Sequence, residues 1–168
     1  MKQILFSLLA LISISAFSQQ DKSKRPSPPA LVTETIKTGN VVTIDYSQPS
    51  VKGRTIGNDI APYGEVWRTG ANEATIFEIS KDAKMEGKTL PAGKYSLYSI
   101  PGEENWVFIF NKAWNQWGTV YDEAKDALRI TVKTGKTKEH VEKMTFEINK
   151  NGTVALLWGG VKADFKVE

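Results

Sequence analysis

The stretch VWRTGANEAT, residues 66–75, brings an indole, a guanidinium, an amide and a carboxylate together around one glycine. Trp67 could stack a sugar ring or another flat ligand, Arg68 could clamp an anion, and Glu73 could act as an acid or base. The same residues could instead form a self-contained corner, with Trp67 in the core, Arg68 paired with Glu73, and Asn72 in the turn. Both interpretations stay open at this stage.

Further side chains suited to binding lie in neighbouring motifs. Lys52 and Arg54 flank a glycine in PSVKGR, and Lys94 follows LPAG. Three cations near one loop could bind a carboxylate, a phosphate or an acidic sugar, although single surface cations need no such role. The leading hypothesis is a binding pocket for a small polar ligand, a carbohydrate, a peptide or an envelope component. Its expected ligand-binding residues are Arg54, Trp67, Arg68, Asn72, Glu73, Lys94 and Trp117.

Several familiar catalytic and metal-binding arrangements lack their residues. The chain has one histidine, His140, and no cysteine, so histidine-based and thiolate metal sites are excluded. No nucleophile elbow and no phosphate loop occurs. A glycosidase needs two carboxylates about 5–9.5 Å apart. Four acidic residues could supply them: Asp45, Asp59, Glu65 and Glu73. A carboxylate-dependent hydrolase is therefore the second hypothesis, and a structural envelope protein without a ligand is the third. We expect no metal and no cofactor.

The first residues have the layout of a secretory signal peptide. Lys2 precedes an apolar run from Ile4 to Phe17, and the small residues Ala16 and Ser18 come just before Gln19. The run is shorter than the roughly 20 residues of a transmembrane helix. We expect cleavage after Ser18, export to the periplasm or beyond, and no transmembrane segment in the mature chain. An uncleaved anchor is the alternative.

The mature chain is predicted to begin with a linker and continue as one domain. Residues 19–30, QQDKSKRPSPPA, are polar and proline-rich, which is typical of an extended or disordered segment. The domain is expected over residues 31–168. Its formal charge comes from lysines interleaved with acidic residues, without the basic stripe of a nucleic-acid-binding protein.

From residue 31 onward, short stretches of alternating apolar residues are separated by turn signals, which predicts antiparallel strands. The clearest hairpin passes through Asn151-Gly152 and favours a two-residue type I′ turn. Helical spacing is confined to Tyr121–Arg129. The chain therefore predicts a single all-β domain, either an antiparallel β-sandwich or a barrel-like fold. The residues expected on inward faces include Val42, Ile44, Tyr46, Met144, Phe146, Ile148, Val154, Leu156 and Trp158.

Two long connections, residues 48–65 and 111–127, interrupt this rhythm. Loops of this length in a compact domain are usually functional or disordered. Both contain aromatic residues, and we expect them to form walls of a site.

Five motifs give the chain a resemblance to a known family. In order, they are YSQPSVKGR, PYGEVWRTGANEAT, LPAGKYSLYSIPG, WVFIFNK and QWG. They resemble domain-of-unknown-function family 2911 over about Val42 to Val167. Members of that family look like exported bacterial proteins, which implies the same compartment here. No activity is established for the family, so the resemblance implies no catalytic residue.

Overall fold

A computed structural model describes residues 21–168. The expected signal peptide, residues 1–18, lies outside the described residues, as does the start of the expected linker. Between residues 21 and 168, no helix has the length and apolar character needed to cross a membrane.

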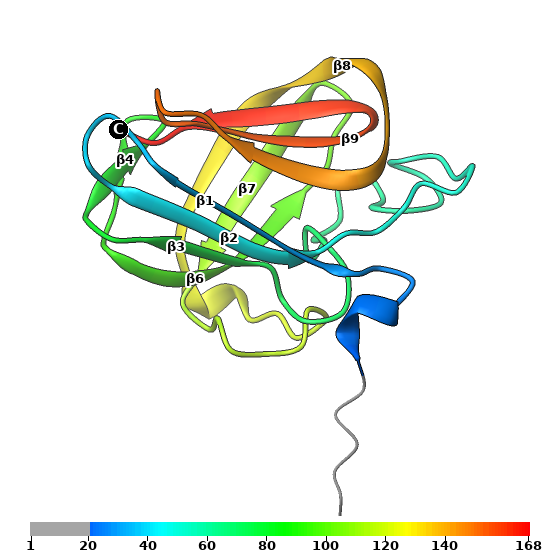
Figure 1. The fold of residues 1–168 in the computed structure, drawn as a ribbon, viewed down its shortest axis with the longest axis horizontal. Coiled ribbons are helices and arrows are strands. Elements are labelled where there is room, and N and C mark those ends of the chain that lie inside the picture. The colour runs from blue at the N-terminus through cyan, green and yellow to red at the C-terminus, as the bar shows by residue number, and fades with distance from the viewer. Residues whose placement is uncertain (1–20) are drawn as a thin grey trace, which may run out of the picture.

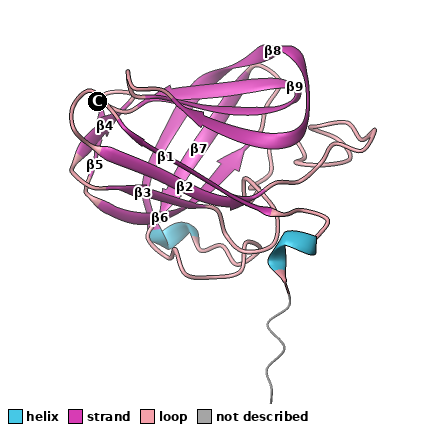
Figure 2. Ribbon diagram, in the orientation of Figure 1, coloured by secondary structure: helices cyan, strands magenta, loops and turns pink. Residues whose placement is uncertain are grey.

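The fold is all-β, which confirms the predicted class. Seven antiparallel strands form one curled sheet in the order β1-β2-β3-β6-β7-β8-β9, and β4 and β5 form a separate ribbon (Figures 1 and 2). The expected helix near residues 121–129 is reduced to one short 3-10 helix, η2 (Glu123–Lys125), and another, η1 (Lys22–Lys24), precedes the sheet. The strands are β1 (Pro29–Thr35), β2 (Val41–Ser47), β3 (Ile76–Ile79), β4 (Ala83–Met85), β5 (Lys88–Leu90), β6 (Gly93–Ile100), β7 (Asn105–Asn111), β8 (Asp126–Ile148) and β9 (Thr153–Lys166).

Strand β8 is long enough to bend and change partners. Its first part, residues 126–133, pairs with β7, and the rest pairs with β9. The β8–β9 hairpin consequently folds back over the curled sheet (Figure 1). The segment after β2 fixes this hairpin, because Val51 N donates to Glu142 O at 2.9 Å and Met144 N donates to Pro49 O at 2.9 Å.

The core lies inside the curl, where the alternating apolar residues meet. Val42 and Ile44 of β2 are fully buried, as the period of two predicts. Phe165 of β9 packs against Phe77 of β3 and Phe108 of β7, with ring centroids 5.9 and 4.9 Å apart. Aromatic contacts of this kind connect the hairpin to the opposite part of the sheet. The outer face of β1, β2 and β3 carries both polar and apolar residues, including Asp45, Ile76 and the 68% exposed Leu31.

The prediction of a two-residue type I′ turn between β8 and β9 is wrong. Asn149 N donates to Thr153 O at 2.9 Å, and Gly152 N donates to Asn149 O at 2.8 Å. Gly152 has a φ of 90°, but Asn151 is not among the residues with positive φ. A type I′ turn needs positive φ at both central residues, whereas a three-residue loop needs it only at the last. The loop therefore includes Lys150 as well as Asn151 and Gly152, and this additional residue changes the turn type.

Residues 21–30 belong to the segment whose composition predicted an extended or disordered linker, and in the structure they include η1 and the start of β1. Strand β1 already begins at Pro29, and Gln48 N donates to Pro28 O at 2.9 Å. Proline fits this position because β1 is an edge strand with one unpaired side. The charged residues before it are held through ion pairs to the domain rather than through apolar burial, which composition alone does not reveal.

Candidate functional site

Residues 67–75 form a corner that continues the sheet beside β6. Trp67 N donates to Ser99 O at 2.7 Å, and Ser99 N donates back to Trp67 O at 2.9 Å. The chain then leaves the sheet through Thr69, whose φ is 50°, and the Thr75 hydroxyl donates to Thr69 O at 2.9 Å. The backbone of the VWRTGANEAT stretch is thus a structural corner.

Trp67 itself packs inward. Its ring stacks on Trp158 at 5.2 Å between centroids and 7° between planes, and it meets Trp106 edge-on at 6.3 Å. Both partner rings are buried. This geometry favours a core role for Trp67 over a role as a stacking platform for a ligand.

The predicted pairing of Arg68 with Glu73 is wrong. The Glu73 carboxylate instead accepts two hydrogen bonds from Arg25 Nη1, at 3.0 and 2.8 Å, and lies 3.0 Å from Lys22 Nζ. Arg25 and Lys22 come from the segment that composition assigned to a linker, so they were not expected to contact the corner.

The Glu73 carboxyl group is strongly acidic. Partial burial by itself would raise its pKa, but the Glu73 backbone N–H and the hydrogen bonds from Lys22 and Arg25 outweigh burial and lower the pKa to about 2. Glu73 is therefore ionised at neutral pH. It can accept hydrogen bonds, but it cannot serve as a proton donor there.

Two other predicted site residues have structural partners. Arg54 donates from Nη2 to Ser50 O at 2.7 Å and from Nε to Val51 O at 3.1 Å. Asn72 adopts a φ of 60° and donates from Nδ2 to Ser27 O at 3.1 Å. Asn72 thus has the left-handed turn conformation considered for it from the sequence.

The remaining two lie in or against the long loop at residues 111–127. Lys94 Nζ is 3.4 Å from Glu78 Oε2 and lies over the Trp114 ring, 5.3 Å from its centroid. Trp117 is 51% exposed, while its backbone forms an antiparallel bridge with Glu73. This bridge holds the loop against the corner.

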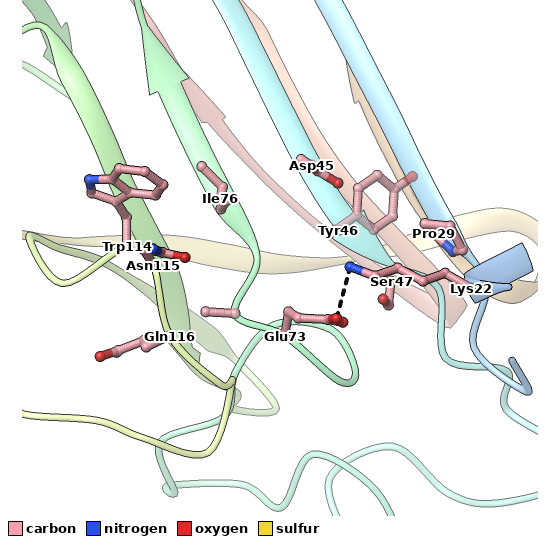
Figure 3. Close-up of a pocket in the computed structure, with 11 residues that line it drawn as sticks. Lys22, Pro29, Asp45, Tyr46, Ser47, Glu73, Ile76, Trp114, Asn115 and Gln116 are labelled. Carbon is pink, nitrogen blue, oxygen red and sulfur yellow. Dashed lines mark ion pairs between the residues drawn. The ribbon is translucent and has the colours of Figure 1, made fainter. Parts of the chain in front are cut away.

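A pocket of about 300 Å³ lies between this loop and the outer face of β2 and β3, and we call it the Trp114 pocket. In the sheet, Asp45 of β2 is opposite Ile76 of β3. Figure 3 shows Trp114 on one side, Asp45 and Lys22 on the other, and Glu73 between them. The pocket is lined by Lys22, Pro29, Asp45, Tyr46, Ser47, Glu73, Ala74, Ile76, Trp114, Asn115 and Gln116.

Hydrogen bonds to the sheet and corner hold the loop wall of the Trp114 pocket in place. Ala74 N donates to Gln116 O at 3.1 Å, and the Ser96 hydroxyl donates to Ala113 O. The indole of Trp114 nevertheless stays 38% exposed. The wall is therefore a fixed aromatic surface.

Of the seven predicted residues, the Trp114 pocket contains one, Glu73. The sequence analysis expected the loop at residues 111–127 to form a wall but did not single out Trp114, Asn115 or Gln116. Asp45 was considered only as a possible catalytic carboxylate. It follows the inward-facing Ile44 in the strand, so alternation already places it on the outer face.

Two further pockets flank the corner. One, of about 300 Å³, brings together the predicted residues Arg54, Trp67 and Arg68, and it also contains Trp158, whose buried Nε1 has no hydrogen-bond partner within residues 21–168. The other, of about 290 Å³, we call the Arg68 pocket. It is lined by Val66, Trp67, Arg68, Tyr98, Gly118, Thr119 and Tyr121.

Acidic residues and the single histidine do not gather into a metal site in the described part of the chain. No group of three or more such side chains there is arranged to hold an ion. The residues that line the described pockets supply hydrogen-bonding groups, charges and aromatic surfaces.

Comparison with known proteins gives one family. A family model described as "Protein of unknown function (DUF2911)" matches residues 27–167, which include the corner and the loop at residues 111–127. No curated protein and no solved structure matches the chain. The family match confirms the resemblance seen in the five sequence motifs.

Proposed function

Since the chain belongs to this family of unknown function and no relative supplies an activity, we propose from the geometry that the protein binds a carbohydrate in the Trp114 pocket. The observation that carries the proposal is a partly exposed indole, Trp114, in one concave site with the carboxylates of Asp45 and Glu73. Sugars present apolar C–H faces and rings of hydroxyl groups, so they match an aromatic surface beside hydrogen-bond acceptors.

The volume and the polar groups suit a small sugar unit. About 300 Å³ is at the lower end of small-molecule pockets, which span about 300–1,000 Å³. Carboxylate oxygens accept hydrogen bonds from hydroxyl groups strongly, because the acceptor is charged. Asn115 adds an amide that can both donate and accept, and its side chain makes no hydrogen bond to residues 21–168.

Trp114 is held in a defined orientation. The Lys94 ammonium lies over its ring and is also paired with Glu78, so the indole is fixed from the sheet side. A fixed aromatic surface loses little conformational entropy when a ligand binds.

The structure favours binding over the carboxylate-dependent hydrolase. Glycoside hydrolysis needs a carboxylic acid whose pKa is raised so that it can protonate the leaving group. The pKa of Glu73 is shifted in the opposite direction, to about 2, by its own backbone and by Lys22 and Arg25. Glu73 is thus suited to accept hydrogen bonds from hydroxyl groups rather than to donate a proton.

The proposal includes the compartment. Residues 1–18 have the layout of a signal peptide, so the expected site of action is the periplasm or the cell exterior.

Titration with a panel of mono- and disaccharides tests the proposal. Binding is measured by isothermal calorimetry and by tryptophan fluorescence for the wild type, Trp114→Ala and the matched control Trp117→Ala, which changes an exposed tryptophan outside the pocket lining. We expect at least a tenfold loss of affinity in Trp114→Ala only. If no sugar binds, or if Trp114→Ala binds as tightly as the wild type, the proposal fails, and a failure to bind any sugar would favour a structural role.

A further inference from the structure

We propose that the Arg68 pocket is a second binding site, which takes a carboxylate attached to an apolar group. It uses different residues from the Trp114 pocket, so it stands independently of the carbohydrate proposal. The inference starts from an arginine that lines a pocket and whose side chain has no hydrogen-bond or ion-pair partner among residues 21–168.

Arg68 faces away from the core. Trp67 and Ser99 are opposite one another in an antiparallel bridge, and the Trp67 ring packs on Trp158. Successive side chains of an extended chain point to opposite faces. Arg68 therefore lies on the outer face of the sheet. The bridge places Arg68 beside Tyr98 of the adjacent strand, and both residues line the pocket.

Gly118 covers the stem of Arg68. A Cβ atom added at Gly118 would lie 2.5 Å from Arg68 Cδ and 3.2 Å from Arg68 Cβ. Gly118 N also donates to Asn72 O at 3.1 Å, which anchors the loop above the stem. The loop thus packs directly on the aliphatic part of Arg68 and fixes where the side chain begins.

The guanidinium lacks the partners that the other arginines have. Arg25 binds Glu73, Arg129 binds Asp126, and Arg54 donates to main-chain carbonyl groups. Arg68 Nε is buried and has no hydrogen-bond partner within residues 21–168, and the side chain forms no ion pair there. The two Nη atoms likewise form no hydrogen bond with residues 21–168, so the guanidinium of Arg68 has donors left to bind a ligand in the pocket that it lines.

The two tyrosines that line the Arg68 pocket have their hydroxyl groups bound elsewhere, and Thr119 adds one hydroxyl group to the lining. Tyr98 and Tyr121 meet edge to face at 4.9 Å. The Tyr98 hydroxyl donates to Val120 O, and the Tyr121 hydroxyl donates to Asp126 Oδ2 at 2.8 Å. Val66, 41% exposed, adds an apolar rim.

One cation among apolar walls selects the class of ligand. A carboxylate carries a single charge and matches the planar guanidinium fork with two parallel hydrogen bonds. A phosphate would need further donors or cations to satisfy its charge, and Arg68 is the only cationic residue among the seven that line the pocket. The apolar part of the ligand packs against the half-buried ring of Tyr121 and against Val66 at the rim. Such a carboxylate belongs either to a free aromatic or aliphatic acid or to the C-terminus of a peptide.

The experiment compares four probes by isothermal calorimetry on the purified protein. Benzoate represents a free acid, and N-acetylphenylalanine represents a peptide C-terminus. N-acetylphenylalaninamide has the same ring without the charge, and inorganic phosphate has charge without a ring. We expect one or both acids to bind, and the amide and phosphate to bind at least tenfold more weakly. The acid that binds more tightly shows whether the carboxylate comes from a free acid or from a peptide C-terminus. Binding of neither acid, or equal binding of the amide or of phosphate, overturns the proposal.

Variants locate the site. Arg68→Gln removes the charge and should weaken acid binding at least tenfold, whereas Lys112→Gln removes an exposed charge outside the pocket lining and should bind like the wild type. Val66→Glu, at an exposed position, places a competing carboxylate at the rim and should also weaken binding, even if Arg68→Gln fails to fold. Wild-type affinity in a folded Arg68→Gln or in Val66→Glu overturns the proposal. Trp114→Ala should leave acid binding intact, which separates this site from the carbohydrate pocket.

Discussion

Arg25 and Glu73 are 48 positions apart in the chain, yet Arg25 Nη1 lies 3.0 and 2.8 Å from the two carboxylate oxygens of Glu73. Lys22 adds a second cation at 3.0 Å. The start of the described chain is thereby fastened to the corner that borders the Trp114 pocket. The pairing also helps to lower the pKa of Glu73 to about 2, so the carboxylate stays charged in mild acid as well as at neutral pH.

Removing the guanidinium should destabilise the domain modestly. Arg25→Ala leaves Glu73 with Lys22 alone, and the side chains of Arg25 and Glu73 are 21% and 39% exposed, so water compensates part of the loss. We expect a loss of about 1 kcal/mol, as for partly exposed ion pairs. This corresponds to a fall in melting temperature of about 2–4 °C for a domain of this size. Lys24→Ala is the control, because among the described residues Lys24 pairs only with the exposed Asp21, at 3.9 Å. Equal melting of Arg25→Ala and the wild type would contradict the assigned role.

The same contact makes stability depend on pH. The pKa of Glu73 falls from an ordinary 4.5 to about 2 in the folded state, with burial opposing and Lys22 and Arg25 favouring the charged form. The folded state therefore binds this proton less readily than the unfolded state. Its stabilising contribution is complete above about pH 4.5 and is lost as the pH falls toward 2.

Urea denaturation between pH 6 and pH 2.5 measures this effect. We expect Glu73→Gln to lose stability less steeply than the wild type on acidification, because it has no carboxyl group to protonate at this position. Glu78→Gln is the control, since Glu78 makes a longer pair of 3.4 Å with Lys94 on the exposed sheet face. Parallel pH profiles for Glu73→Gln and the wild type would count against the lowered pKa.

The strands were predictable because each depends on local alternation. The inward positions of β2, Val42 and Ile44, are buried as period two requires, and the long apolar strand β7 is buried on both faces over most of its length. The turn at Gly152 was only partly predictable. Glycine marked the left-handed position, but the number of loop residues depends on the register of β8 against β9.

The site was harder to predict because it depends on contacts distant in sequence. Trp67 and Arg68 are adjacent and both line the two pockets beside the corner, but the Trp67 ring packs inward on Trp158, which spacing in the sequence does not reveal. The partner of Glu73 is likewise in a segment whose composition indicated a linker. Asp45 could have been placed on the outer face from alternation alone.

The glycine at the β8–β9 turn offers a direct test of the turn. Gly152→Val introduces a β-branched residue at a φ of 90°, and its Cβ would lie 2.1 Å from Val167 O, a main-chain atom. We expect a loss of at least about 1–3 kcal/mol from backbone strain alone, with the clash adding to it. Gly160→Ala is the matched control in β9, because its φ is not in the left-handed region and an added Cβ meets nothing within 4 Å. Similar melting temperatures for the two variants would contradict the turn geometry.

Gly118→Ala tests whether acid binding depends on where the Arg68 side chain lies, because it displaces that side chain without removing its charge. The added methyl group would lie 2.5 Å from Arg68 Cδ and 2.8 Å from Asn72 O, so the side chain must swing away and the loop must shift slightly. A flexible side chain can yield, and the expected loss of stability is about 1–3 kcal/mol, in the range of overpacking. Acid binding should fall at least tenfold, because the guanidinium no longer lies where the pocket walls hold the ligand. Thermal melts and calorimetric titration with benzoate and N-acetylphenylalanine measure both effects, with Gly160→Ala as the control. A folded Gly118→Ala variant that binds these acids like the wild type would show that the loop does not position Arg68 for binding.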